Sequence, residues 1–380
     1  MRQRDQGLAE SGSHISLMPM KKSSLPILLG LCALAHAGTI FLPAYPDHIL
    51  VIDEASQQIV DKIPSEIGIP TAISQSYDRK KIYVTSNDKD GVEVIDIATH
   101  KVLDHFELNH GNQQFRIYGV APDPQDKLLY TVVREVVKQA DRYEIGKFKY
   151  AVIDLAQQKI VRTADMSAED QEGNNPYPGS NPFHISPDGK YMYQFRDKIT
   201  ILDTNNFHIS DTIDLAKPDF PDMANMGIGA PVGTLDEQGA FVSLFSAEDS
   251  VVHRRFFGIA RFDLNSREFK FTEIGPAPAG MMGIQVSPDR KTGYSVISSG
   301  EHGNRRCEFW SFDLATNQRT MTAEFSCRPR FSFGISSDGK KLYLYGAGFE
   351  IEVWNAATLK LEHTIDLHND VTMGGIIVVP

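Results

Sequence analysis

Short stretches of alternating apolar and polar residues recur along the chain, and a small polar turn divides each one. Residues 51–60 read VIDEASQQIV, and similar words return as VIDIATHKVL at 94–103 and VIDLAQQKIV at 152–161. An alternation with a period of two on both sides of a polar turn is typical of two antiparallel β-strands. Each copy therefore predicts a β-hairpin.

Seven copies of this hairpin occur, and the remaining four are ILDTNNFHIS from 201, RFDLNSREFK from 261, SFDLATNQRT from 311 and VWNAATLKLE from 353. The equivalent acidic or amide positions are Asp53, Asp96, Asp154, Asp203, Asp263, Asp313 and Asn355. Their successive spacings of 43, 58, 49, 60, 50 and 42 residues suit a four-stranded propeller blade. We interpret the shared position as a turn-former whose side chain caps backbone N–H groups, a role that Asn can share with Asp.

A second phrase precedes most hairpins and predicts the first two strands of each blade. It is clearest in SPDGKYMYQF from 186 and SSDGKKLYLYG from 336, where an Asp-Gly turn joins two strand-like runs. The first hairpin is preceded only by TIFLPA at 39–44, while the chain ends in VTMGGIIVVP, a first-strand sequence without a following hairpin. The two ends are thus expected to complete one blade together, which closes the ring.

Residues 38–380 are therefore predicted to form an all-β, seven-bladed β-propeller, closed by pairing of the N- and C-terminal strands and almost without helix. The alternative, a β-sandwich, offers no reason for seven repetitions of an Asp before a polar turn. A hydrophobic content of 41% is enough to bury a sizeable core.

Residues 1–37 read as an N-terminal extension followed by a signal peptide. Lys21 and Lys22 precede the apolar run LPILLGLCALAHA, which ends in an A-x-A pattern before Gly38. The run is too short to cross a bilayer as a helix, so we expect cleavage between Ala37 and Gly38 and no membrane span afterwards. The expected location is the periplasm or the extracellular space.

Cysteine content fits export. Cys32 leaves with the signal peptide, so Cys307 and Cys327 remain in an oxidising compartment, where a disulfide is the natural pairing and two buried thiols are the alternative. The sequence has no CxxCH motif, and we expect no c-type haem on this chain. A formal charge of −11 without a strongly basic run argues against nucleic acid as a partner.

In a propeller the turns inside the two repeated phrases lie on one face, and the loops between phrases lie on the other. The segments expected as loops on this second face are long: 134–148, 168–182, 216–231, 246–257 and 299–306. Binding residues concentrate on loops that a rigid scaffold positions, so we expect this face to meet a ligand or partner. The side chains expected there are Arg116, Tyr118, Asn181, Met281, Met282, His302, Arg330 and Phe331, with Met373 beside them.

Two of these residues carry specific alternatives. Arg116 and Arg330 could hold a carboxylate of a ligand or partner, or they could satisfy loop carbonyls. His110, His253 and His302 lie in expected loops, but no two share one loop at a short spacing, so we predict no metal site.

No catalytic residues are predicted. Glu301 with His302, and Asp249 with His253, could be acid–base pairs, but nothing nucleophilic accompanies them. The chain also lacks a G-x-S-x-G elbow, a Walker loop and a dinucleotide-binding glycine motif. The residues alone indicate a scaffold or binder rather than a self-contained enzyme.

Both phrases resemble the YVTN family of exported propeller repeats, with YVTS at 83–86 close to the name. The chain further resembles the β subunit of quinohemoprotein amine dehydrogenase, a periplasmic seven-bladed propeller. This resemblance rests on PDHILVID near the start, RDKITILD in the middle, and SSDGKKLYL followed by VWNAATLKLEHTIDL near the end.

The resemblance implies a non-catalytic subunit of a complex that oxidises primary amines. A dihaem cytochrome c subunit and a small subunit bearing cysteine tryptophylquinone would carry the chemistry, so both cofactors are expected in partners and none in this chain. Two alternatives stand beside it. One is a stand-alone YVTN-type binding or surface protein, and the other is a lactonase-like hydrolase with a metal at the channel mouth.

Overall fold

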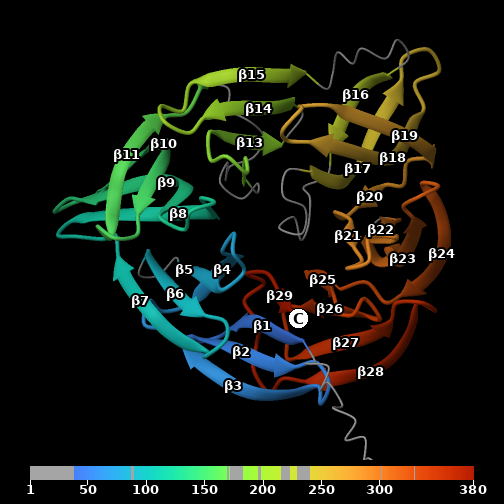
Figure 1. The fold of residues 1–380 in the computed structure, drawn as a ribbon, viewed down its shortest axis with the longest axis horizontal. Helices are drawn as coiled ribbons and strands as arrows, with labels where there is room; N and C mark the ends of the chain where they lie inside the picture. Colours follow the sequence, from blue (N-terminus) through green and yellow to red (C-terminus); the bar gives the residue numbers. More distant parts are fainter. Residues whose placement is uncertain are drawn as a thin grey trace, which may run out of the picture. The chain divides into compact units, whose positions relative to one another are not determined.

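Seven antiparallel sheets make up the described part of the computed structural model, which covers residues 38–86, 90–168, 171, 183–195, 198–214, 223–228, 240–300, 302–328 and 330–380. Figure 1 shows the sheets following one another around a ring in chain order. We number them as blades 1 to 7. The predicted all-β, seven-bladed propeller is confirmed.

Blade 1 contains both ends of the described chain. β1 (Thr39–Ala44), β2 (His48–Asp53) and β3 (Gln58–Pro64) pair in order, and β29 (Ile377–Val379) pairs with the inner edge of β1. The register sets Thr39 opposite Val379 and Phe41 opposite Ile377. The predicted closure by the terminal strands is confirmed, and it covers an edge that would otherwise invite pairing with another chain.

The other blades are built from consecutive strands. Blade 2 comprises β4 (Pro70–Gln75), β5 (Lys81–Ser86), β6 (Gly91–Asp96) and β7 (Lys101–Glu107). Blade 3 comprises β8 (Gln113–Pro122), β9 (Leu128–Lys138), β10 (Tyr143–Asp154) and β11 (Lys159–Asp165). Blade 4 comprises β12 (Phe183–Ile185), β13 (Tyr191–Phe195), β14 (Lys198–Asp203) and β15 (Ile209–Asp214).

Blades 5 to 7 follow the same plan. Blade 5 comprises β16 (Met223–Ile228), β17 (Ala240–Asp249), β18 (Arg255–Asp263) and β19 (Phe269–Pro276). In blade 6 the inner strand is broken into β20 (Gly280–Met281) and β21 (Gln285–Val286), followed by β22 (Thr292–Ser299), β23 (Arg306–Asp313) and β24 (Gln318–Phe325). Blade 7 comprises β25 (Phe331–Ile335), β26 (Lys341–Gly346), β27 (Glu350–Asn355) and β28 (Lys360–Asp366).

Packing between blades holds the ring together. Among the described residues, buried apolar side chains form seven clusters, one at each junction between neighbouring blades. At the closing junction, Leu50 and Ile52 of blade 1 pack with Tyr343 and Val353 of blade 7. Fully burying one such aliphatic side chain is worth about 1.5–3 kcal/mol, so the middle strands are the most stabilising part of each blade.

The hairpin turns repeat one geometry in all seven blades. In blade 1 the Asp53 carboxylate accepts hydrogen bonds from the backbone N–H and the hydroxyl of Ser56, at 2.7 and 2.6 Å. The fifth residue of each turn has a positive φ: Gln57, His100, Gln158, Phe207, Arg267, Asn317 and Leu359. The prediction that the shared Asp is a turn-former is confirmed, and Asn355 plays the same part by accepting from the Thr358 N–H at 3.0 Å.

These hairpin turns share a face with the turns between first and second strands. The backbone N–H of Ile97, beside the blade 2 hairpin turn, donates to the Lys80 carbonyl at 2.9 Å, and blade 3 repeats this bond from Leu155 to Lys127 at 3.0 Å. We call this side the turn face. The opposite side, formed by the loops from second to third strand and from fourth strand to the next blade, is the loop face.

Candidate functional site

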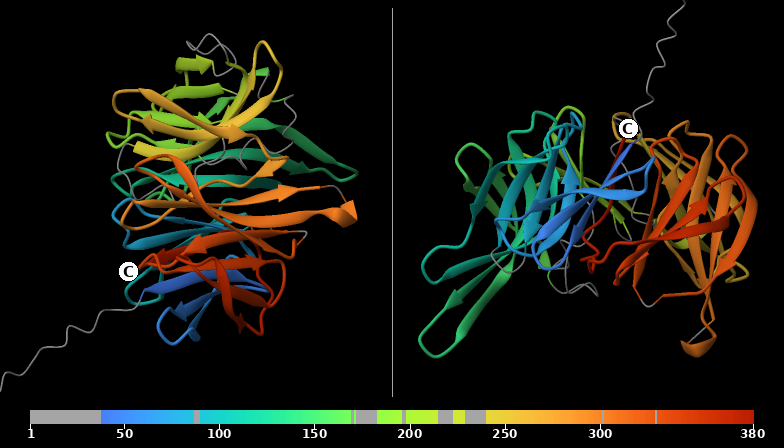
Figure 2. Two further views of the ribbon diagram at one scale, coloured as in Figure 1. Left: turned by 90° about the vertical axis from the view of Figure 1, so that its right-hand side faces the viewer. Right: turned by 90° about the horizontal axis from the view of Figure 1, so that it is seen from below.

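The loop face carries the largest departures from the common blade plan. β9 and β10 continue as one hairpin whose last pair is Lys138 with Tyr143, and the segment between β22 and β23 contains the 3₁₀ helix η3 (His302–Asn304). Figure 2 shows these two features extending from the same side of the ring. The expectation that 134–148 forms a loop is wrong, because Val136 and Val137 continue the strand alternation and keep pairing with β8 and β10.

Segment 246–257 was also expected as a loop. It is largely strand as well, because β17 continues to Asp249 and β18 starts again at Arg255, which leaves a short turn between them. Within 299–306, strand pairing likewise extends to Ser299 opposite Arg306. In the part of the loop face that the structure describes, extended hairpins therefore replace much of the expected irregular chain, and these hairpins can hold side chains in fixed positions.

Large apolar side chains are exposed at the tips of loop-face hairpins in blades 1, 3, 5 and 7. They are Tyr45, Tyr143, Ile145, Val251, Val252 and Phe349, with exposed fractions of 42, 58, 60, 75, 61 and 58%. Elsewhere in the described chain, exposed large apolar side chains lie only on the outermost strands of blades. A single exposed apolar residue is ordinary, whereas a contiguous apolar patch marks a binding surface; these six side chains share the loop face but lie on four different blades.

Arginines accompany these apolar tips. Arg142 contacts Glu144 at 2.6 Å near the tip of the blade 3 hairpin, and the Arg328 guanidinium reaches Glu350 and Glu352 at 2.5 and 2.6 Å. Arg254, Arg305 and Arg330 are exposed. Apolar groups mixed with arginines are typical of protein interfaces, in which aromatic residues and Arg are enriched.

The structure places Arg116 and Tyr118 on β8 in different surroundings. Arg116 is exposed and lies opposite Arg134, whose guanidinium sits 4.8 Å from the centre of the Phe148 ring. Tyr118 is half-buried and packs edge-on against Phe148 with ring centres 5.3 Å apart. Arg116 thus belongs to the loop-face surface, whereas Tyr118 belongs largely to the junction between blades 3 and 4.

Met281, Met282 and Phe331 are half-buried and contribute to packing. Met281 packs at the junction of blades 5 and 6, while Met282 and Phe331 pack at the junction of blades 6 and 7. The carbonyl of Met282 accepts a hydrogen bond from the Ser295 hydroxyl at 2.9 Å. Arg330 is exposed just before β25, and its carbonyl accepts from the Ala347 N–H at 3.3 Å.

The remaining predicted positions are described only in part. Asn181 lies outside the described residues, and for His302 the structure describes the backbone, which begins η3. Met373 is half-buried against the junction of blades 7 and 1. The described members of the predicted set lie on several blades, and of these Met282 and Phe331 pack in the same cluster between blades 6 and 7.

Two of the three histidines considered as ligands, His110 and His253, have other partners. His110 Nδ1 lies 3.0 Å from the Leu108 carbonyl oxygen. His253 Nδ1 lies 3.0 Å from Glu248 Oε1, so its carboxylate partner is Glu248 rather than the expected Asp249. Within the described residues, no group of three or more His, Cys, Asp and Glu side chains gathers in a way that could hold a metal ion.

The described residues also include no helix long and apolar enough to cross a membrane.

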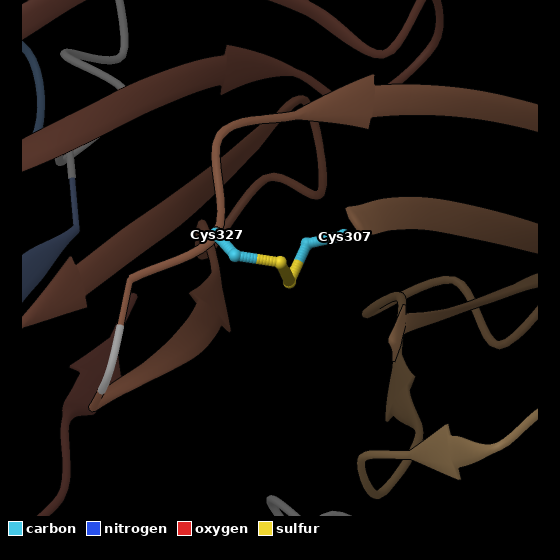
Figure 3. Close-up of a disulfide and its surroundings, with 2 residues drawn as sticks. All are labelled: Cys307 and Cys327. Atoms are coloured by element: carbon cyan, nitrogen blue, oxygen red, sulfur yellow. A yellow bond between two sulfur atoms is a disulfide. The ribbon is translucent and has the colours of Figure 1, made fainter. Parts of the chain in front are cut away.

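Cys307 and Cys327 are joined by a disulfide, with Cα atoms 5.2 Å apart (Figure 3). Cys307 lies near the start of β23, and Cys327 follows the end of β24. The bond therefore ties the outer hairpin of blade 6 together at its loop-face end, where Cys307 is fully buried.

One buried acid was not anticipated from the sequence. Glu93 on β6 has no solvent-exposed surface, and its carboxylate accepts the Glu66 N–H at 2.8 Å. Removal from water raises the pKa of Glu93. In the sequence GVEVID, Glu93 occupies a polar position of the alternating pattern and would be expected to face solvent. The middle strands of a blade are covered on both faces, however, so this position is also buried.

A hollow of about 300 Å³ lies between the outer strands of blades 3 and 4. Its wall is largely aromatic and aliphatic, from Tyr150, Leu202 and Phe207, and Asp165 and His208 add polar groups. The Tyr150 and Phe207 rings stack with centres 5.3 Å apart, so the wall is part of the packing between these blades.

The described sheets form a seven-bladed β-propeller whose loop face carries the exposed apolar side chains. No protein-family model matches the sequence, and no curated protein is similar to it. Likeness is found among solved structures, at identities that establish the fold alone.

One similar structure is a protein from Bacteroides fragilis described as a candidate 6-phosphogluconolactonase, with a TM-score of 0.54, 13% identity, and coverage of 92% of this chain and 99% of that one. A protein of unknown function from Desulfotomaculum acetoxidans gives a TM-score of 0.53 at 13% identity, covering 90% and 98%. The dihydro-haem d1 dehydrogenase NirN gives a TM-score of 0.51 at 13% identity, covering 90% of this chain and 75% of that one.

Proposed function

We propose that this chain is an exported propeller subunit without catalytic residues of its own, which uses its loop face to dock on the redox subunits of a complex. The complex we have in mind resembles quinohemoprotein amine dehydrogenase. In it a dihaem cytochrome c subunit and a small subunit with cysteine tryptophylquinone would oxidise primary amines.

The observation that carries the proposal is the set of exposed apolar side chains on the loop-face hairpins. Tyr143, Ile145 and Phe349 each expose more than half of their surface, which costs free energy in water unless a partner covers them. Arginines lie among these apolar side chains, and this combination is typical of a specific protein interface.

Two further observations agree with the proposal. A disulfide between Cys307 and Cys327 suits a compartment outside the cytoplasm, as the signal-like residues 1–37 also predict. The sequence resemblance to the amine dehydrogenase β subunit supplies the class of partner.

The test is to isolate the tagged chain from its source organism and to examine what accompanies it. We expect stoichiometric co-purification of a haem-containing polypeptide, visible by its c-type haem absorption, and reduction of that haem when a primary amine is added. A colourless, monomeric isolate would argue for the stand-alone binding or surface protein instead.

The lactonase-like alternative draws on the candidate 6-phosphogluconolactonases among the similar structures, from Bacteroides fragilis and Bacteroides uniformis. It requires a metal ion bound at the channel mouth. Elemental analysis of the purified chain decides between the two: about one tightly bound metal per chain, together with lactone hydrolysis that chelation abolishes, would replace the proposed function.

A further inference from the structure

The loop-face tip of blade 5 repeats the geometry of the turn-face hairpins. The Asp249 carboxylate accepts the N–H groups of Val251 and Val252, both at 2.8 Å, and His253 has a φ of +55°. The His253 N–H donates to the Asp249 carbonyl at 3.0 Å, as the Arg267 N–H does to the Asp263 carbonyl at 2.8 Å. This tip is therefore a defined turn rather than a loose loop.

The repeated turn offers an internal comparison of what belongs at its apex. The two apex positions of the turn-face copies hold small or polar residues in every case: Ala55–Ser56, Ala98–Thr99, Ala156–Gln157, Asn205–Asn206, Asn265–Ser266, Ala315–Thr316 and Ala357–Thr358. At the loop-face copy these positions hold Val251 and Val252. The turn itself therefore does not require large apolar residues at its apex.

The two valines are directed to solvent rather than into the protein. Val251 exposes 75% and Val252 61% of its surface, so neither contributes appreciably to the core. Valine is also stiff at its first side-chain torsion, so ordering it on binding costs little entropy. A rigid apolar knob of this kind is well suited to enter a shaped pocket.

The C-terminal flank of the apex is basic, whereas Glu248 and Asp249 precede the apex. His253, Arg254 and Arg255 follow the valines directly and are exposed, and the Arg255 guanidinium donates to the Ser246 hydroxyl at 3.1 Å. The nearby acids are engaged: Asp249 holds the turn, and Glu248 lies 3.0 Å from the His253 ring. The tip thus presents two valines with two exposed arginines, Arg254 and Arg255, on one side.

We propose that the Asp249–Arg254 turn is the specific anchor of the loop face, and that it inserts Val251 and Val252 into an apolar socket of a partner protein whose rim carries carboxylates. The inference rests on the proposed function, because it assigns a point of contact within the same face. Arg254 and Arg255 meet the rim, which sets the orientation and speeds association.

A protein partner fits these features better than a membrane does. Interfacial segments insert with Trp, Phe and Leu over a wide apolar face, whereas this tip offers two valines. The net negative charge of the chain also opposes approach to an anionic bilayer.

The direct test is a photo-reactive amino acid introduced at position 251 of the full chain in the source organism. The same reagent at position 315, in the matching turn on the turn face, is the control. We expect position 251 to cross-link to one partner polypeptide, at a segment rich in apolar residues with Asp or Glu beside them, and position 315 to give no such product. Cross-linking to lipid, to a second copy of this chain, or to nothing would overturn the inference.

A second experiment measures the contribution of the valines. Val251→Ser combined with Val252→Ser should weaken the affinity for this partner by about 100-fold or more, the factor expected when two valine side chains lose a buried site, and the partner should no longer co-purify. Ala315→Ser combined with Thr316→Ser, in the control turn, should leave the affinity unchanged. Arg254→Glu should weaken binding most at low salt. Retention of the partner at wild-type levels by the double serine variant would refute the anchor.

The two proposals can fail separately. If the double serine variant still co-purifies with the haem subunit, the anchor is wrong and the proposed function stands. If position 251 cross-links to an apolar socket with an acidic rim on a protein outside any redox complex, the anchor stands and the proposed function is wrong.

Discussion

At the scale of the residue, one side chain organises each outer hairpin. The carboxylate at the Asp position accepts backbone N–H groups inside the turn, which allows the fifth residue to adopt a positive φ without being glycine. Gln57 and Leu359 are examples, and neither would be chosen for a left-handed conformation from its type alone. The capping interaction therefore explains why the word VID recurs while the later turn residues vary.

Asp53→Ala should destabilise the propeller by about 1 kcal/mol, the usual net worth of a hydrogen bond of this kind. Asp53→Asn should retain most of that stability at neutral pH, because Asn355 caps the corresponding turn of blade 7. Urea unfolding of the three proteins at pH 7 measures both effects. Equal losses in the two variants would show that capping is not the reason why the Asp recurs in each hairpin.

The stability that Asp53 contributes should depend on pH. The Ser56 hydroxyl and N–H hold the pKa of Asp53 below its ordinary value, as similar donors do for Asp96. A lowered folded-state pKa gives stability that is present above the unfolded pKa and lost as the pH falls through the folded pKa. Wild type should therefore lose its advantage over Asp53→Ala below about pH 4. A stability difference that persists unchanged at pH 2.5 would contradict this.

Glu93 should affect the pH dependence of stability in the opposite direction to Asp53. Burial raises its pKa above the ordinary value of 4.5, so the native state keeps a proton that the unfolded chain has already lost. Stability then falls as the pH rises through this window, and Glu93→Gln should remove that slope. Urea unfolding midpoints measured from pH 4.5 to 8 test this. The midpoint of Glu93→Gln should rise relative to that of wild type as the pH rises. Parallel pH profiles of the two proteins would disprove the raised pKa of Glu93.

At the scale of the element, the sequence was informative where local pattern decides the structure. The seven hairpins and the pairing of TIFLPA with the terminal strand follow from alternation and copy number, and the structure contains them. The extension of β9 and β10 through Lys138 and Tyr143 could not be predicted, because charged residues within REVVKQADRYEIGKF mask the strand pattern.

The candidate site was harder to predict for the same physical reason. Pattern alone does not say whether Tyr118 or Phe331 packs between blades or faces solvent; both were expected on the binding face, and both pack at junctions between blades. Segments 134–148 and 246–257 were expected on this face, but the sequence did not single out Val251 within them, and it did not indicate the exposed Phe349. Their significance appears only from their exposure and from the face that they share.

The disulfide gives a prediction at this scale. It closes a loop with a sequence separation of 20 around the outer hairpin of blade 6. Replacing both Cys307 and Cys327 by Ser should lower the free energy of unfolding by about 3 kcal/mol, through the extra freedom of the unfolded chain. The check is a thiol titration and urea unfolding of exported protein. Two titratable thiols in unfolded, unreduced protein would show that the bond is not formed in the cell.

At the scale of the whole molecule, contacts that hold the ring together lie on the turn face, and exposed side chains lie on the loop face. The turn face consists of repeated short turns, and hydrogen bonds join neighbouring blades there. At the closing junction, for example, the Tyr343 hydroxyl donates to the Glu54 carboxylate at 2.8 Å. The loop face carries the extended hairpins and the exposed apolar tips. A rigid ring that closes on itself can present such tips in fixed relative positions without further support.

The most direct test of this account compares amide hydrogen exchange of the chain alone with exchange in the complex isolated from its source. We predict slower exchange on the loop face, at 139–145, 249–255 and 347–350, and unchanged exchange in turn-face segments such as 53–58. Protection confined to the turn face, or no protection in an intact complex, would contradict the claim that the loop face is the docking surface.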